Sequence, residues 1–194
     1  GVGSYVITYS YTDVNGCSGS VSAQITEPTA VTLNPTTTTN ATCFGGNNGS
    51  ITVNPTGGTL GYTYQWSNGL PTNQTVNNLQ AGNYSVTVRD ANQCSVTGSA
   101  TVSQPSQIVF GNAIIQDVRC FNGNTGIITI SVSGGAGGYS YSWSHSAGLN
   151  SATATNLTAG NYTVDVADVF GCTVTASYTV SQPANGLTFN ASSI

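Results

Sequence analysis

Short runs in which apolar and polar residues alternate dominate the chain. In the run YTYQW at residues 62–66, the aromatic side chains fall on one face of a strand and the polar side chains on the other, because side chains alternate across a strand. Similar runs fill residues 84–88 and 94–102, and turns rich in Gly and Asn separate them. The pattern predicts an all-β chain of tandem immunoglobulin-like antiparallel β-sandwich domains.

The aromatic residues of these runs are predicted to form the core of each domain. Because they alternate with Thr, Gln and Ser, the pattern favours burial over the alternative, an exposed platform that stacks on sugars. The predicted core aromatics are Tyr62, Tyr64, Trp66, Tyr84, Tyr139, Tyr141, Trp143 and Tyr162. The pattern around Tyr5, Tyr9 and Tyr11 differs and does not assign those side chains to a face.

The chain also repeats itself. Cys120 follows Cys43, and Tyr162 follows Tyr84, at an offset of about 77 residues. A period of this length exceeds that of solenoid repeats and is typical of small domains in tandem. We therefore divide the chain into the C-terminal half of an upstream repeat at 1–30, complete β-sandwich repeats at 31–107 and 108–185, and the start of a next repeat at 186–194.

Proline marks the end of each unit. A Glu-Pro or Gln-Pro pair stands at residues 27–28, 104–105 and 182–183. Proline can stop a sheet and stiffen a short linker. The boundaries therefore predict rod-like tandem domains with short linkers.

The composition excludes several functions. The 194 residues include two Lys+Arg and six Asp+Glu, so charged residues make up 4%. Two basic residues cannot neutralise a row of phosphates, which excludes nucleic-acid binding, and they cannot form a polybasic membrane patch. No apolar run approaches the ~20 residues of a membrane helix, so we expect no direct membrane insertion. A hydrophobic content of 38% argues against disorder.

Five cysteines occupy two recurring places. Cys43 and Cys120 precede an early strand, and Cys17, Cys94 and Cys172 open the last strand of a unit. Units this small bury limited surface, which favours disulfides. We favour bridges within units, Cys43–Cys94 and Cys120–Cys172, which leave Cys17 unpaired, because each unit must be stable wherever it sits. Bridges between units, Cys17–Cys43 and Cys94–Cys120, fit the spacing equally well, and buried reduced thiols are a third alternative.

Candidate chemistry is sparse. Asp13, Asp90 and Asp168 each stand four residues before a cysteine, and we predict turn aspartates that bond backbone N–H groups, with calcium ligands as the alternative. His145 is the only histidine, and no nucleophile motif surrounds it, so a loop role is expected. Without a CxxC spacing, zinc is not expected either. We expect no catalytic residues, no metal and no cofactor, and thus no enzyme.

The repeated motifs resemble a known family. CFGGNNGSITV at 43–53, GGTLGYTYQWSNG at 57–69, LQAGNYSVTVRDANQC at 79–94 and the closing VSQP at 102–105 resemble the SprB-type repeat of giant surface adhesins in gliding Bacteroidetes. The resemblance covers nearly all of 42–105 and 119–183. It implies export by the type IX secretion system and display as filaments on the cell surface, and it implies no catalytic residues.

The sequence thus leads to a functional hypothesis with two alternatives. The first is a structural repeat segment, the stalk or filament shaft of a secreted cell-surface adhesin for surface attachment or gliding. The alternatives are a carbohydrate-binding module and an accessory region of a secreted hydrolase. Expected partners are further repeats of the same chain, laterally associated copies, since no Lys guards the strand edges, and polysaccharide or abiotic surfaces.

Overall fold

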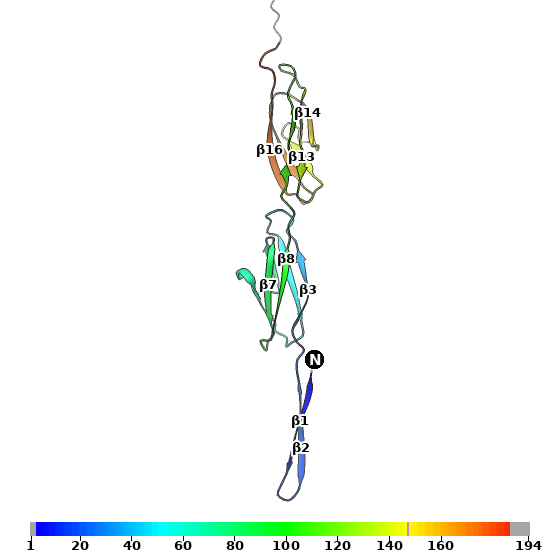
Figure 1. Ribbon diagram of the computed structural model, residues 1–194, viewed down its shortest axis with the longest axis vertical. Helices are drawn as coiled ribbons and strands as arrows, with labels where there is room; N and C mark the ends of the chain where they lie inside the picture. The colour runs from blue at the N-terminus through cyan, green and yellow to red at the C-terminus, as the bar shows by residue number, and fades with distance from the viewer. Residues whose placement is uncertain (1–2, 147, 187–194) are drawn as a thin grey trace, which may run out of the picture. The chain divides into compact units, whose positions relative to one another are not determined.

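The computed structural model describes residues 3–146 and 148–186, and strands dominate them. The chain divides into two compact units, the first made of Gly1–Thr39 and Gly49–Val102 and the second of Asn40–Asn48 and Ser103–Ile194 (Figure 1). The predicted all-β fold of tandem immunoglobulin-like sandwiches is confirmed. Apart from Gly186, the predicted start of a next repeat at 186–194 lies outside the described residues.

Unit 1 holds a hairpin and two three-stranded sheets, ordered β3-β4-β6 and β5-β7-β8. The hairpin consists of β1 (Ser4–Thr12) and β2 (Ser18–Thr26). The sheets consist of β3 (Thr32–Thr39), β4 (Gly49–Thr56), β5 (Thr63–Trp66), β6 (Thr75–Leu79), β7 (Gly82–Arg89) and β8 (Ser95–Val102), with a 3-10 turn η1 (Ser67–Gly69) after β5.

Unit 2 repeats the two three-stranded sheets, ordered β10-β11-β14 and β13-β15-β16, and adds a short pair, β9 and β12. The strands are β9 (Val109–Phe110), β10 (Ile114–Gln116), β11 (Gly126–Thr129), β12 (Val132–Ser133), β13 (Ser140–Trp143), β14 (Thr153–Leu157), β15 (Gly160–Ala167) and β16 (Thr173–Val180).

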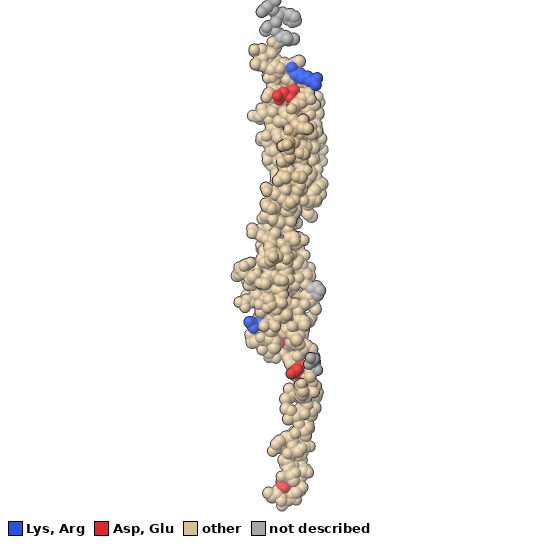
Figure 2. Space-filling view, in the orientation of Figure 1, with Lys and Arg blue, Asp and Glu red and all other residues tan. Residues whose placement is uncertain are grey.

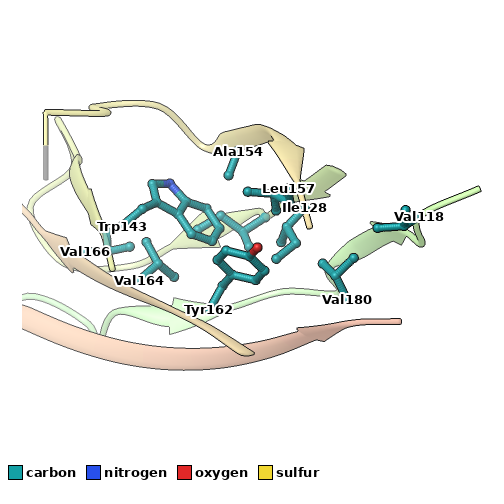
Figure 3. Packing of buried hydrophobic residues seen from close by; sticks show 10 residues of the cluster. Val118, Ile128, Trp143, Ala154, Leu157, Tyr162, Val164, Val166 and Val180 are labelled. Carbon is teal, nitrogen blue, oxygen red and sulfur yellow. The ribbon is translucent and has the colours of Figure 1, made fainter. Parts of the chain in front are cut away.

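Each sandwich encloses a core of aliphatic side chains around one tryptophan. Trp66 is 6% exposed and Trp143 is 1% exposed, and Figure 3 shows Trp143 packed with its neighbours in unit 2. Tyr162 is buried, and the other tyrosines of the predicted core set are half-buried against the same clusters. A platform for stacking sugars would need these rings at the surface, so the burial favours the core interpretation.

The indole N–H of each tryptophan also donates a hydrogen bond. The indole N–H of Trp66 donates to the Asn73 carbonyl at 2.8 Å, and that of Trp143 donates to the Ser151 carbonyl at 2.9 Å. A buried indole without a partner would lose its hydrogen bond to water, so these contacts also fix the loops that follow β5 and β13.

The hairpin β1–β2 copies the strand register of β7–β8 one repeat period earlier in the chain. Tyr9 pairs with Val21 in the hairpin, as Val86 pairs with Gly98 in the sandwich. The face that turns to the core in β7–β8 is exposed in the hairpin, where Tyr9 is 66% exposed. That face carries Tyr5, Ile7, Tyr9, Tyr11, Val21, Ala23 and Ile25. The structure thus assigns the three tyrosines that the sequence pattern left unplaced.

Hydroxyl and amide side chains bond across neighbouring strands where many proteins place ion pairs. The Thr101 hydroxyl donates to Asn83 Oδ1 at 2.7 Å, and Thr179 donates to Asn161 Oδ1 at 2.7 Å in the equivalent place. Figure 2 shows the charged residues as scattered points on the visible face. Neutral cross-strand pairs of this kind contribute about 0.2–1 kcal/mol each and depend little on salt.

Within residues 3–146 and 148–186, no helix is long and apolar enough to cross a membrane.

Candidate functional site

A disulfide joins Cys43 to Cys172, whose Cα atoms lie 5.7 Å apart across 129 residues of sequence. Cys43 lies in the loop of residues 40–48 between β3 and β4, and Cys172 lies in the turn before β16. Both belong to unit 2, because this loop groups with the second unit and not with the strands that flank it. By the sequence period, however, Cys43 belongs to the first repeat and Cys172 to the second. The bridge therefore links successive repeats.

The predicted pairing is wrong. Neither Cys43–Cys94 nor Cys120–Cys172 is formed, and neither are the alternatives Cys17–Cys43 and Cys94–Cys120. Cys17, Cys94 and Cys120 are free and exposed in the described part of the chain. Only Cys17 was expected to be unpaired.

The geometry of one strand explains why a bridge within a repeat does not form. Cys172 directly precedes β16, whereas the loop that carries Cys120 is bonded beyond the far end of that strand, where the Val118 N–H donates to the Ser181 carbonyl at 2.9 Å. The eight residues of β16 span about 26 Å, and disulfide-bonded cysteines need Cα atoms within about 7 Å. The two cysteines of one repeat thus lie at opposite ends of its last strand.

The glutamine before each boundary proline holds the cysteine loop. The Gly45 N–H donates to Gln104 Oε1 at 2.7 Å, and in the second repeat the Asn122 N–H donates to Gln182 Oε1 at 2.8 Å. The role of this glutamine, unlike that of the proline, was not predicted from the sequence. Its recurrence before the proline in both complete repeats was the pattern that could have revealed it.

A hollow of about 400 Å³ opens beside the bridge. It is lined in part by Cys43, Phe44, Ile108, Gly135 and Cys172. The loop of the first repeat therefore faces two turns of the second, the Gly-Gly turn that contains Gly135 and the turn that carries Cys172.

Asp168 builds the turn that carries Cys172. Its Oδ1 accepts the N–H groups of Phe170 at 2.9 Å and Cys172 at 3.0 Å, and its Oδ2 accepts the Ala136 N–H at 2.9 Å. Asp90 makes the three equivalent bonds in the first repeat. These bonds, above all the one from Ala136, lower the pKa of the Asp168 carboxyl and outweigh the opposing effect of burial. The carboxylate thus ties the cysteine turn to the Gly-Gly turn.

Asp13 forms a simpler version of this turn in the hairpin. Its exposed carboxylate accepts the N–H groups of Asn15 at 3.0 Å and Cys17 at 2.8 Å. All three aspartates therefore bond backbone N–H groups, as the turn prediction requires. Within the described ranges, no group of three or more His, Cys, Asp or Glu side chains could hold a metal ion.

The SprB repeat family model matches residues 36–71 and 112–148, one segment in each complete repeat of the sequence analysis. The resemblance to the SprB repeat is thus confirmed at these two segments. No curated protein matches it.

Several solved structures resemble the chain in fold. The eight N-terminal immunoglobulin domains of Down syndrome cell adhesion molecule share 13% identity over 91% of this chain and 28% of that chain, with a TM-score of 0.45. Three N-terminal domains of the bacteriophage RB49 highly immunogenic outer capsid protein share 19% identity over 79% of this chain and 59% of that chain, also with a TM-score of 0.45. Domains 1–6 of surface layer protein SbsC share 14% identity over 94% of this chain and 36% of that chain, with a TM-score of 0.38. This chain spans less than two thirds of each of them, and the likeness is one of fold alone.

The aspartate turns of the two complete repeats lead us to expect a stability that falls in acid. Because the folded-state pKa of Asp90 and Asp168 is lowered, their contribution is present above the unfolded pKa and is lost as pH falls through the folded one. We expect the free energy of unfolding to drop between about pH 4 and pH 2. Asp90→Asn and Asp168→Asn should each weaken that dependence. Urea titrations at several pH values measure this, and equal pH profiles for all three proteins would contradict it.

A second prediction concerns the stability contributed by the Gly-Gly turn of the second repeat. Gly134 has φ +84°, its carbonyl accepts the Tyr139 hydroxyl, and an added Cβ would collide with the Gln107 carbonyl oxygen. Gly134→Ala should therefore cost about 3 kcal/mol or more, the sum of a left-handed backbone and a backbone clash. Gly137→Ala is the matched control, because Gly137 has φ +76° and open space around the added Cβ. It should cost about 1–2 kcal/mol. Equal losses in denaturant unfolding would refute the clash.

His145 packs against aromatic rings. Its ring centroid lies 6.1 Å from that of Trp143 and 5.3 Å from that of Tyr162, both edge-on. Asn68 takes its place in the first SprB repeat. The position therefore has a packing role in one repeat and no chemistry common to both.

Proposed function

We propose that the chain is a stretch of the shaft of a large secreted cell-surface adhesin, in which SprB repeats hold a binding part away from the cell and carry tension. The observation that carries this proposal is the Cys43–Cys172 bridge, which connects residues 129 positions apart in successive repeats. Tension between the two chain ends passes through the S–S bond, because the bond is the shorter covalent path. Residues 44–171 then bear no load.

The proposed location is extracellular. Disulfides form and persist in oxidising environments such as the cell exterior, and are rare in the cytosol. The two SprB segments support the same location. Export by the type IX secretion system and a part in gliding are finer elements of the same proposal, and they rest on the family resemblance.

The proposed role is structural and not catalytic. The two SprB repeats share their core, their turn aspartates and their cysteine places, and none of these groups forms an acid, base or nucleophile constellation. The side-chain hydrogen bonds across strands also suit a shaft in changing salt, since there are few charges to screen.

An attachment experiment separates a shaft from a carbohydrate-binding module. Cells would display a binding domain of known ligand on shafts that contain different numbers of these repeats. We expect capture of ligand-coated beads to increase with repeat number, while the purified chain alone does not sediment with insoluble polysaccharide. Sedimentation of the chain with polysaccharide, lost on replacing an exposed aromatic such as Phe44, would favour the binding module instead.

A further inference from the structure

We propose that a second surface of unit 2 binds the cysteine turn of a following SprB repeat, and that Cys120 forms a disulfide with the cysteine of that turn. The surface, here called the Cys120 patch, surrounds a hollow of about 450 Å³. Its residues are Arg119, Cys120, Phe121, Pro183, Asn185 and Gly186. The inference deepens the shaft function and depends on it only in requiring another repeat.

The Cys120 patch is the counterpart of the loop that already forms a bridge. Cys120 and Phe121 stand one repeat period after Cys43 and Phe44. Both loops are held in the same way, since each donates a backbone N–H to the glutamine of the Gln-Pro pair, Gln104 for the first loop and Gln182 for the second. Phe121 is 44% exposed and Cys120 is free. The patch therefore presents a cysteine and an aromatic ring in a prepared loop.

The existing bridge shows what such a loop binds. Cys43 and Phe44 face the Gly-Gly turn at Gly135 and the Asp-x-x-x-Cys turn at Cys172. A following repeat would present these two turns to the Cys120 patch. A partner of this kind commits the surface to another SprB repeat, not to a glycan or an unrelated protein.

Unit 1 also contains a cysteine turn of the kind that the Cys120 patch would bind, and its cysteine is free. Cys94 is free and exposed at the end of an Asp-x-x-x-Cys turn in unit 1. Asp90 ties that turn to the Gly-Gly turn through the Thr59 N–H at 2.9 Å, as Asp168 does beside Cys172. Unit 1 therefore offers the same two turns to the cysteine loop of a preceding repeat.

Bond formation is an oxidation of two thiols. The S–H bonds of Cys120 and the turn cysteine break, one S–S bond forms, and the two released protons are taken up by the two thiols formed from the oxidant. Two electrons reduce a disulfide oxidant to two thiols, oxidised glutathione in the test and a thiol–disulfide oxidoreductase in the cell.

Bridges of this kind at every junction would form two interleaved covalent paths. The turn cysteine of one repeat and the loop cysteine that follows it are separated by the same short stretch of chain, both from Cys17 to Cys43 and from Cys94 to Cys120. In each path, one S–S bond would bypass most of two repeats, so that only this short stretch of chain would bear tension. The pairing rule thus predicts a shaft that can lengthen only by extension of these short stretches, even if single repeats unfold.

The test is disulfide mapping of a lengthened chain in which residues 1–186 are followed by a second copy of residues 108–186. Cys17→Ser and Cys94→Ser in the original part and Cys120→Ser in the added repeat leave four cysteines. Thr175→Ser in the added repeat marks its Cys172 peptide by mass, and the serine keeps a hydroxyl for Asp165. The protein is oxidised with glutathione and digested without reduction.

We expect two bridges, the original Cys43–Cys172 and a new one from Cys120 to the mass-marked cysteine, with loss of the Cys120 thiol that the present chain exposes. A Cys120 that stays open to alkylation, or that pairs within its own repeat, overturns the proposal. The Cys43–Cys172 bridge in the same sample reports that the chain has folded. Because the readout is covalent connectivity, failure here leaves the attachment test of the shaft function unaffected.

Discussion

Cys43→Ser or Cys172→Ser is expected to lower the free energy of unfolding by about 5 kcal/mol, the largest stability effect in the chain. The bridge connects residues 129 positions apart, and a cross-link over so long a loop removes much of the entropy of the unfolded chain. The loss is comparable to the whole stability of many small domains, so the variants should unfold at clearly lower denaturant concentration. Equilibrium unfolding in guanidinium chloride, monitored by tryptophan fluorescence, measures it.

Matched controls come from the other cysteines. Cys94→Ser and Cys120→Ser remove exposed free thiols and should leave stability almost unchanged. The double variant Cys43→Ser/Cys172→Ser should lose no more than either single variant, since each single change already opens the bridge. Additive losses would show that the two side chains stabilise the fold separately and that the bridge is not closed in solution.

The strands and the turns could be predicted from the sequence because each rests on a local pattern. Alternation identifies a strand and its two faces, so Trp66 and Trp143 were placed in the core correctly. The tight spacing of an aspartate and a cysteine identified the turns at Asp90 and Asp168. These features depend on residues close together in sequence.

The disulfide could not be predicted from the same patterns. Periodicity shows that Cys43 and Cys120 hold equivalent places, but it does not show at which end of a strand each loop lies. Once β16 separates Cys120 from Cys172, a bridge within the repeat is excluded, and only the topology contains that information. The bond from the Ala136 N–H to Asp168 escaped prediction for the same reason, because it joins turns 32 residues apart.

Pulling the chain by its two ends should reveal a large hidden length. With the bridge closed, only residues outside the loop from Cys43 to Cys172 can extend. Reduction should add about 440 Å of contour length, because 129 residues are released and an extended chain spans roughly 3.4 Å per residue. Single-molecule force spectroscopy with and without a thiol reductant measures the difference directly.

The released length also distinguishes this bridge from the pairing within repeats. Bridges Cys43–Cys94 and Cys120–Cys172 each close a much shorter loop, and together they would hide about 350 Å. Cys94→Ser and Cys120→Ser should leave the full increment intact, whereas Cys43→Ser should abolish it and give the full contour length without reductant. An increment of about 350 Å, or one that Cys94→Ser shortens, would mean that tension is carried within repeats and that the link between successive repeats does not bear load.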